Sequence, residues 1–170
     1  MTIGHHHGGA PLPEKRFSGR VEFQQLIRDA LECAGREGWR ELILCDADFE
    51  DWPLAEREVV DSLAAWSRHG RHITMIARRW DHVIRFQARF VTWRRSWADI
   101  IEARGCRGAD PAEFPSAIWT PAWMMQRHDL IRCNGIATFD AARRLNLRQE
   151  LDEWVRQSAS AFPASTLGLA

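Results

Sequence analysis

Four acidic residues stand close together in this chain and are the first group whose spacing could do chemistry: Asp46, Asp48, Glu50 and Asp51. They follow the apolar run 42–45, which is typical of a strand buried on both faces. In open parallel sheets, ligands bind at the carboxyl ends of the strands. Asp46 and Asp48 could hold Mg²⁺ at such an edge, or one of them could attack a phosphoryl group. The simpler interpretation, which we favour, is that these acids are solvated and that Asp51 caps the next helix.

The segment around these acids also resembles a known family. Residues 42–48, LILCDAD, are similar to the first motif of haloacid-dehalogenase-type phosphatases. That resemblance implies a Mg²⁺-dependent phosphoesterase using Asp46 and Asp48, with a catalytic lysine on a later loop. The sequence has one lysine, Lys15, which precedes the motif, and Phe49 stands where the family usually has a small or hydroxyl residue. Arginine cannot replace that lysine, because it neither exchanges a proton near neutral pH nor forms a Schiff base. The phosphoesterase is therefore an alternative and not the leading hypothesis.

A second group of candidate residues surrounds an Asn-Gly pair late in the chain. Asn134-Gly135 lies between the short apolar runs 130–133 and 136–139, and Asn-Gly in that setting predicts the turn of a β-hairpin. Arg127, His128 and Asp129 come shortly before this pair. The sequence therefore places four polar side chains, including that of Asn134, on one predicted hairpin.

The elements that must position these groups alternate along the first two thirds of the chain. Apolar periodicity predicts helices over 18–38, 51–70 and 80–97, and short apolar runs predict strands over 41–46, 72–77 and 99–103. The predicted hairpin follows, and Asp140 caps a last helix. Because alternating helices and strands favour a parallel sheet, we expect an α/β fold with three layers. Its largely parallel sheet would have five or six strands, flanking helices and a late β-hairpin.

This order of elements resembles one half of a phospholipase D-like domain over about residues 17–160. That superfamily carries a histidine nucleophile, a lysine and an aspartate on the hairpin. When Asn134-Gly135 is set on the family's Asp-Gly, Arg127 takes the histidine position and Asp129 the lysine position, while His128 is one position off. The resemblance therefore implies the scaffold without the hydrolase and no catalytic residues.

The same resemblance implies what such a scaffold would do. We expect a non-catalytic domain that binds an anionic ligand or a protein partner, with Arg127, His128, Asp129 and Asn134 as candidate binding residues. Half-domains of the superfamily pair about a twofold axis, so a homodimer is also expected. No cofactor is expected, apart from Mg²⁺ in the phosphoesterase alternative.

The predicted helix over 80–97 supports a further alternative. Arg78, Arg85 and Arg89 would face water there, among tryptophans, and arginine with tryptophan is the composition of a surface that binds single-stranded nucleic acid. Helical spacing places most of the aromatic side chains on the core face, so a solvated face over an aromatic core is the simpler explanation. The net charge of zero also argues against nucleic acid.

Length and composition set the remaining bounds. The 170 residues are 45% hydrophobic and 27% charged, which predicts a single globular domain over 17–170. Residues 1–16 are rich in His, Gly and Pro and are expected to form a disordered leader. The four cysteines lack CxxC or zinc-like spacing, so we expect reduced thiols and a cytoplasmic protein. No segment is predicted to be a signal peptide or a membrane helix.

Overall fold

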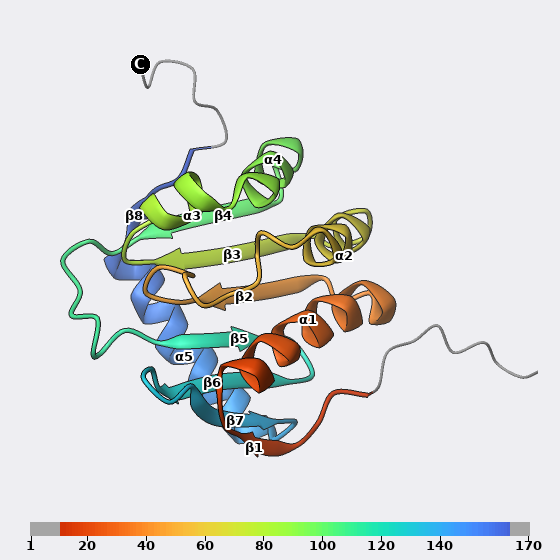
Figure 1. The fold of residues 1–170 in the computed structure, drawn as a ribbon, viewed down its shortest axis with the longest axis vertical. Helices are drawn as coiled ribbons and strands as arrows, with labels where there is room; N and C mark the ends of the chain where they lie inside the picture. The colour runs from red at the N-terminus through yellow and green to blue at the C-terminus, as the bar shows by residue number, and fades with distance from the viewer. Residues whose placement is uncertain (1–10, 164–170) are drawn as a thin grey trace, which may run out of the picture.

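The computed structural model describes residues 11–163, which contain one mixed sheet of eight strands with helices on both of its faces (Figure 1). The strands are β1 (Lys15–Phe17), β2 (Glu41–Cys45), β3 (His72–Ala77), β4 (Ile101–Gly105), β5 (Ser116–Trp119), β6 (Met124–Asp129), β7 (Asn134–Thr138) and β8 (Ala159–Ser160). The helices are α1 (Arg20–Glu37), α2 (Arg57–Ser67), α3 (Asp81–Phe86), α4 (Ala88–Ser96) and α5 (Ala141–Gln157). Neighbouring strands follow the order β1-β7-β6-β5-β2-β3-β4-β8.

The prediction of a largely parallel sheet of five or six strands is wrong. Only β2–β3 and β3–β4 pair in parallel within the described chain, and the other five pairings are antiparallel. The segments 120–123 and 130–133 that join β5, β6 and β7 are too short for a parallel crossover, which needs about a dozen residues or more. The edge strands β1 and β8 raise the number of strands to eight, and both lie in segments where the sequence predicted no strand.

The sheet is buried on both sides in its centre. Leu42 and Leu44 of β2 belong to the core that contains residues of α1, α2 and α4, whereas Ile43 and Cys45 pack with Leu147 and Leu151 of α5. In Figure 1, α1 to α4 lie in front of the strands and α5 crosses behind them. The alternation of strand side chains therefore decides which face, and which set of helices, each residue meets.

Two helix boundaries differ from the sequence prediction, each for a local reason. The predicted helix over 80–97 is two helices, because Gln87 leaves helical geometry and its buried amide Nε2 donates to the carbonyl oxygen of Phe49 at 3.1 Å. The predicted helix over 51–70 begins at Arg57, so Asp51 does not cap it.

The described part of the predicted leader, residues 11–16, is packed against the domain rather than free of it. Leu12 is buried, and Lys15 and Arg16 belong to β1, which pairs antiparallel with β7. The Nζ of Lys15 lies 3.1 Å from a carboxylate oxygen of Glu22 in α1. The rest of the predicted leader, residues 1–10, lies outside the described residues.

Two smaller features bear on the expected environment. All four cysteines are buried and unpaired. Among the helices of residues 11–163, we find none with the length and apolar character needed to cross a bilayer.

Candidate functional site

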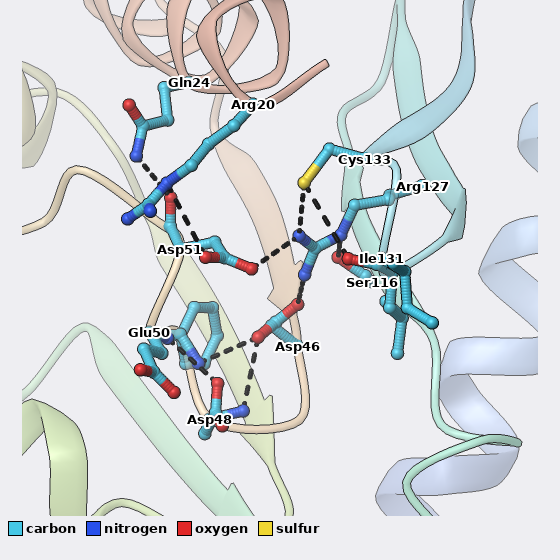
Figure 2. Close-up of polar contacts among 12 residues, drawn as sticks. Arg20, Gln24, Asp46, Asp48, Glu50, Asp51, Ser116, Arg127, Ile131 and Cys133 are labelled. Atoms are coloured by element: carbon cyan, nitrogen blue, oxygen red, sulfur yellow. Dashed lines mark hydrogen bonds and ion pairs between the residues drawn. The ribbon is translucent and has the colours of Figure 1, made fainter. Parts of the chain in front are cut away.

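Arg127 lies at the centre of a buried network of charges (Figure 2). It comes from β6 and points to the face covered by α1, where its guanidinium lies 4.3 Å from the centre of the Phe23 ring. Its Nη2 donates to Asp46 Oδ1 at 3.0 Å and its Nη1 to Asp51 Oδ2 at 2.9 Å. The side chains of Arg127 and Asp46 are only 4% and 2% exposed. The guanidinium is thus enclosed by two carboxylates and an aromatic ring.

Two further contacts fix the orientation of the Arg127 guanidinium. Its Nε donates to Ser116 Oγ at 3.1 Å, and its Nη1 is 3.3 Å from the Sγ of Cys133. Burial alone would lower the pKa of Arg127, but the charge of Asp46 and the hydrogen bond with Asp51 outweigh it and the pKa is raised. An arginine so held stays protonated and cannot act as a general base.

The acidic cluster is occupied by protein groups. The second oxygen of Asp46, Oδ2, accepts the backbone N–H of Phe49 at 2.8 Å and that of Asp48 at 3.2 Å. Asp48 Oδ1 in turn accepts the backbone N–H of Glu50 at 2.9 Å. No group of three His, Cys, Asp or Glu side chains within residues 11–163 is placed to hold a metal ion. A magnesium ion on Asp46 and Asp48 would therefore have to displace the Arg127 ion pair.

The predicted hairpin is present, but its turn is not where Asn-Gly predicts it. The turn is formed by residues 130–133, and Asn134 and Gly135 are the first residues of β7. Asp129 stabilises this turn, because its Oδ1 accepts the backbone N–H groups of Ile131 at 3.0 Å and Arg132 at 2.9 Å. The turn contains one residue with a positive φ angle, and that residue is Cys133, with φ of 55°.

Gly135 is needed for a different reason, namely close packing between strands. A Cβ atom at this position would overlap the carbonyl oxygen of Gln126 in β6 and the ring of Phe17 in β1. Asn-Gly therefore marks close packing within the sheet here, and the prediction that it forms the turn is wrong.

The other predicted hairpin residues meet on the opposite side of β6 from Arg127. The pairing of β6 with β7 is irregular at His128, between Arg127 and Asp129. A depression of about 470 Å³ lies there, which we call the β6–β7 pocket. Its lining residues are Arg16, Phe17, Ser18, His128, Asp129, Asn134, Gly135, Ile136 and Arg143. The structure thus brings His128, Asp129 and Asn134 together and places Arg127 elsewhere.

Hydrogen-bond donors outnumber free acceptors in the β6–β7 pocket. The side chains of Arg16, His128 and Arg143 are exposed and form no hydrogen bond or ion pair with any described residue. Asn134 Oδ1 accepts the hydroxyl of Ser18 at 2.9 Å, which leaves its NH₂ group able to donate to a ligand. Asp129 Oδ1 accepts two backbone N–H groups, so one oxygen of this carboxylate is occupied by the protein and Oδ2 is the free acceptor of the pocket. Together with the apolar surface of Ile136, this arrangement suits an anion that carries an apolar part.

Arg16 and Arg143 were not predicted as site residues. Arg16 lies in the predicted leader and Arg143 in the first turn of α5, and they share the pocket only because β1 pairs with β7. No spacing in the sequence links two positions so far apart. To find Arg16 from the sequence, one would have to predict that β1 is a strand. Three residues flanked by prolines and glycines are too short a run to indicate a strand.

The arginines predicted around the 80–97 helix do not form one surface. Arg78 Nε donates to the carbonyl oxygen of Ala109 at 2.6 Å, and Arg89 Nη1 to that of Ala55 at 3.0 Å. The guanidinium of Arg85 lies over the ring of its neighbour Phe86 at 5.4 Å. Of the three tryptophans expected to stack with bases, Trp80 and Trp93 are buried, at 5% and 3% exposed, and Trp97 is partly buried.

Comparisons with known proteins define the fold more than the function. No protein-family model and no curated protein matches the chain. Among solved structures, the same fold occurs in a chromatin protein. That protein is TrmBL2, an archaeal chromatin protein whose structure is described as showing a novel mode of DNA binding. The likeness has a TM-score of 0.67 at 13% identity over 91% of this chain, which spans 56% of the TrmBL2 chain. At this identity, the likeness concerns the fold alone.

Proposed function

We propose that this chain is a non-catalytic binding domain of the phospholipase D-like type, and that it holds an anionic ligand in the β6–β7 pocket. The observation that carries the proposal is the pair of exposed guanidiniums, Arg16 and Arg143, beside the apolar side chain of Ile136. Guanidiniums bind phosphate and carboxylate groups in a bidentate manner. Neither has a carboxylate partner among residues 11–163, so both are available to a ligand.

The buried charges support the non-catalytic part of the proposal. The position that the resemblance assigns to the histidine nucleophile holds Arg127, whose guanidinium is committed to Asp46 and Asp51. An arginine with a raised pKa cannot attack a phosphorus atom or exchange a proton at neutral pH. The commitment of Arg127 to this ion pair supports a function in binding without turnover.

The similarity to TrmBL2 adds a candidate anion. TrmBL2 binds DNA by its description, so nucleic acid is one polyanion that a domain of this fold could contact. The phospholipase D-like resemblance further leads us to expect self-association as a homodimer, which sedimentation at micromolar concentration would test. A clean monomer would remove that part of the proposal and leave the pocket unaffected.

A thermal melt followed by tryptophan emission tests the pocket directly. Tripolyphosphate at about a hundred times its dissociation constant should add about 2.7 kcal/mol to the free energy of unfolding, which raises Tm by several degrees. The double variant Arg16→Ala/Arg143→Ala should lose this shift. Arg132→Ala, an exposed arginine on the β6–β7 turn outside the pocket, is the matched control and should keep it. No shift with the native protein, or an equal shift with the double variant, would contradict the proposal.

A further inference from the structure

We infer that the ligand of this site is a single-stranded nucleic acid, bound as two adjacent bases with their connecting phosphate. The inference rests on the proposed function, and it adds a second depression beside the first. This depression measures about 540 Å³ and lies along β1, β7 and the start of α5. Its lining residues are Glu14, Lys15, Arg16, Ile136, Ala137, Thr138, Phe139, Asp140 and Arg143. We call the two depressions together the β1–β7 trough.

The two depressions meet at the guanidiniums. Arg16, Ile136 and Arg143 line both of them, so the two cations lie between one depression and the other. A dinucleotide step has the same alternation, because one phosphate joins two nucleosides with flat, largely apolar bases. A phosphomonoester would occupy one depression and leave the other empty. Two depressions that share a pair of cations thus suit a strand of at least two nucleotides.

The second depression offers an aromatic ring for stacking. Phe139 is 45% exposed, and it follows β7 directly at the start of the connection to α5. A base stacks on an exposed aromatic ring whatever its sequence, because every base has a π-face. The first depression also has an exposed ring, that of His128, among its lining residues. These rings would contact unpaired bases, which a duplex keeps inside its own stack.

The acidic side chains of the trough limit how much backbone it can bind. Glu14 Oε1 accepts the hydroxyl of Thr138 at 2.8 Å and the backbone N–H of Phe139 at 3.0 Å, and the pKa of Glu14 is lowered mainly by the Thr138 bond. Asp140 Oδ2 accepts the backbone N–H of Arg143 at 2.9 Å. The carboxylates of Glu14 and Asp140, and that of Asp129 in the first depression, repel further phosphates. We therefore expect contact with about one phosphate and a weak dependence of affinity on salt.

Fluorescence anisotropy with labelled hexanucleotides tests this ligand. The probes are one DNA hexamer, the RNA hexamer of the same sequence, the matching DNA duplex and a mononucleotide as competitor. Both hexamers should bind, and the duplex and the mononucleotide should bind at least about tenfold more weakly. Because one phosphate contact gives a slope of about −0.7 against the logarithm of salt, affinity should fall only about threefold between 50 and 200 mM salt. Unequal binding of the DNA and RNA hexamers would assign the physiological strand.

Three variants separate base stacking from anion binding. Phe139→Leu keeps the apolar contact but removes the ring, so hexamer binding should weaken at least about fivefold while the tripolyphosphate shift in Tm stays unchanged. Arg143→Ala should weaken hexamer binding and reduce the tripolyphosphate shift in Tm. Arg132→Ala should change neither of these two measurements. Each variant is checked by its melt. If one unfolds, Arg143→Lys or Phe139→Met replaces it.

The outcomes distinguish the two claims. If tripolyphosphate binds through Arg16 and Arg143 but Phe139→Leu leaves hexamer binding unchanged, the nucleic-acid inference is overturned and the proposed function stands. Equal affinity for the duplex, or for the mononucleotide, also overturns the inference. If neither tripolyphosphate nor a hexamer binds, both claims fail.

Discussion

The guanidinium of Arg127 lies 3.0 Å from the carboxylate of Asp46, although the two residues are 81 positions apart in the chain. Asp46 follows β2, near the middle of the sheet, and Arg127 is in β6, so their contact crosses over β5. The sequence marks both residues as candidates for chemistry, one for a metal and one for an anionic ligand. In the structure, each is the other's partner, and the pair joins the hairpin to the acidic loop.

Removal of Arg127 is therefore expected to destabilise the protein strongly. Arg127→Ala leaves the buried Asp46 carboxylate without its counter-charge, and breaking such a pair costs about 3–5 kcal/mol. Urea denaturation with linear extrapolation measures the change in the free energy of unfolding. In a double-mutant cycle with Asp46→Asn, the double variant should lose less than the sum of the two single changes.

The exposed Arg132→Ala variant serves as the control for this cycle and should change the free energy of unfolding by no more than about 0.5 kcal/mol. Additive effects of Arg127→Ala and Asp46→Asn would show that the two side chains do not stabilise each other, contrary to this structure.

Local signals in the sequence predict single elements of this fold well. The apolar run 72–77 is β3, Gly38 ends α1 in the left-handed conformation, and Asp140 caps α5 by accepting the backbone N–H of Arg143. Each of these depends on a few neighbouring residues. They could be predicted because periodicity, a glycine with positive φ and a capping carboxylate act within one or two turns of chain.

The pairing of strands could not be predicted in the same way. Whether β5 lies parallel or antiparallel to β2 depends on where the 106–115 loop returns, which no local pattern specifies. In the candidate site too, residues that are close in sequence could be predicted together, and residues brought together by long-range pairing could not. His128, Asp129 and Asn134 share a hairpin and were predicted together, whereas Arg16 reaches the site through the long-range pairing of β1 with β7.

Close packing of β7 between its neighbours makes Gly135 a sensitive position. In Gly135→Ala, the new Cβ meets the Gln126 carbonyl and the Phe17 ring, and because one of these is backbone the strands must separate. We expect a loss of about 1–3 kcal/mol or more, measured by urea denaturation. Gly108→Ala is the matched control, since a Cβ there meets no atom within 4 Å. Equal stability of the two variants would contradict the register of β1, β7 and β6.

The contact between α1 and the residue that precedes α2 should make stability depend on pH. Arg28 Nε and Nη2 each donate to one oxygen of Glu56 at 2.7 Å, and this hydrogen bonding lowers the pKa of Glu56 below its ordinary 4.5. A carboxyl with a lowered pKa in the folded state stabilises the protein fully above its ordinary pKa. That stabilisation is lost as the pH falls through the folded value. Because both groups are partly exposed, the contribution is at most about 1 kcal/mol.

Glu56→Gln tests this dependence. The variant should be less stable than the native protein at pH 7, and the difference in the free energy of unfolding should narrow as the pH falls below 4.5 and through the lowered pKa of Glu56. Glu113→Gln, which changes an exposed glutamate with no side-chain partner among residues 11–163, should show no such trend. A difference that stays constant over this pH range would show that the charge of Glu56 does not contribute.

Magnesium is expected to leave the stability of the protein unchanged. Both oxygens of Asp46 are occupied, one by the Arg127 guanidinium and the other by backbone N–H groups, so a cation would have to compete with a positive charge already in place. A melt with and without millimolar Mg²⁺ should therefore give the same Tm. Asp46→Asn should lower Tm equally in both conditions, because it weakens the ion pair rather than a metal site. If Mg²⁺ instead raises Tm and Asp46→Asn abolishes the rise, the Arg127 pair must open in solution, and the phosphoesterase alternative with Asp46 and Asp48 would have to be reconsidered.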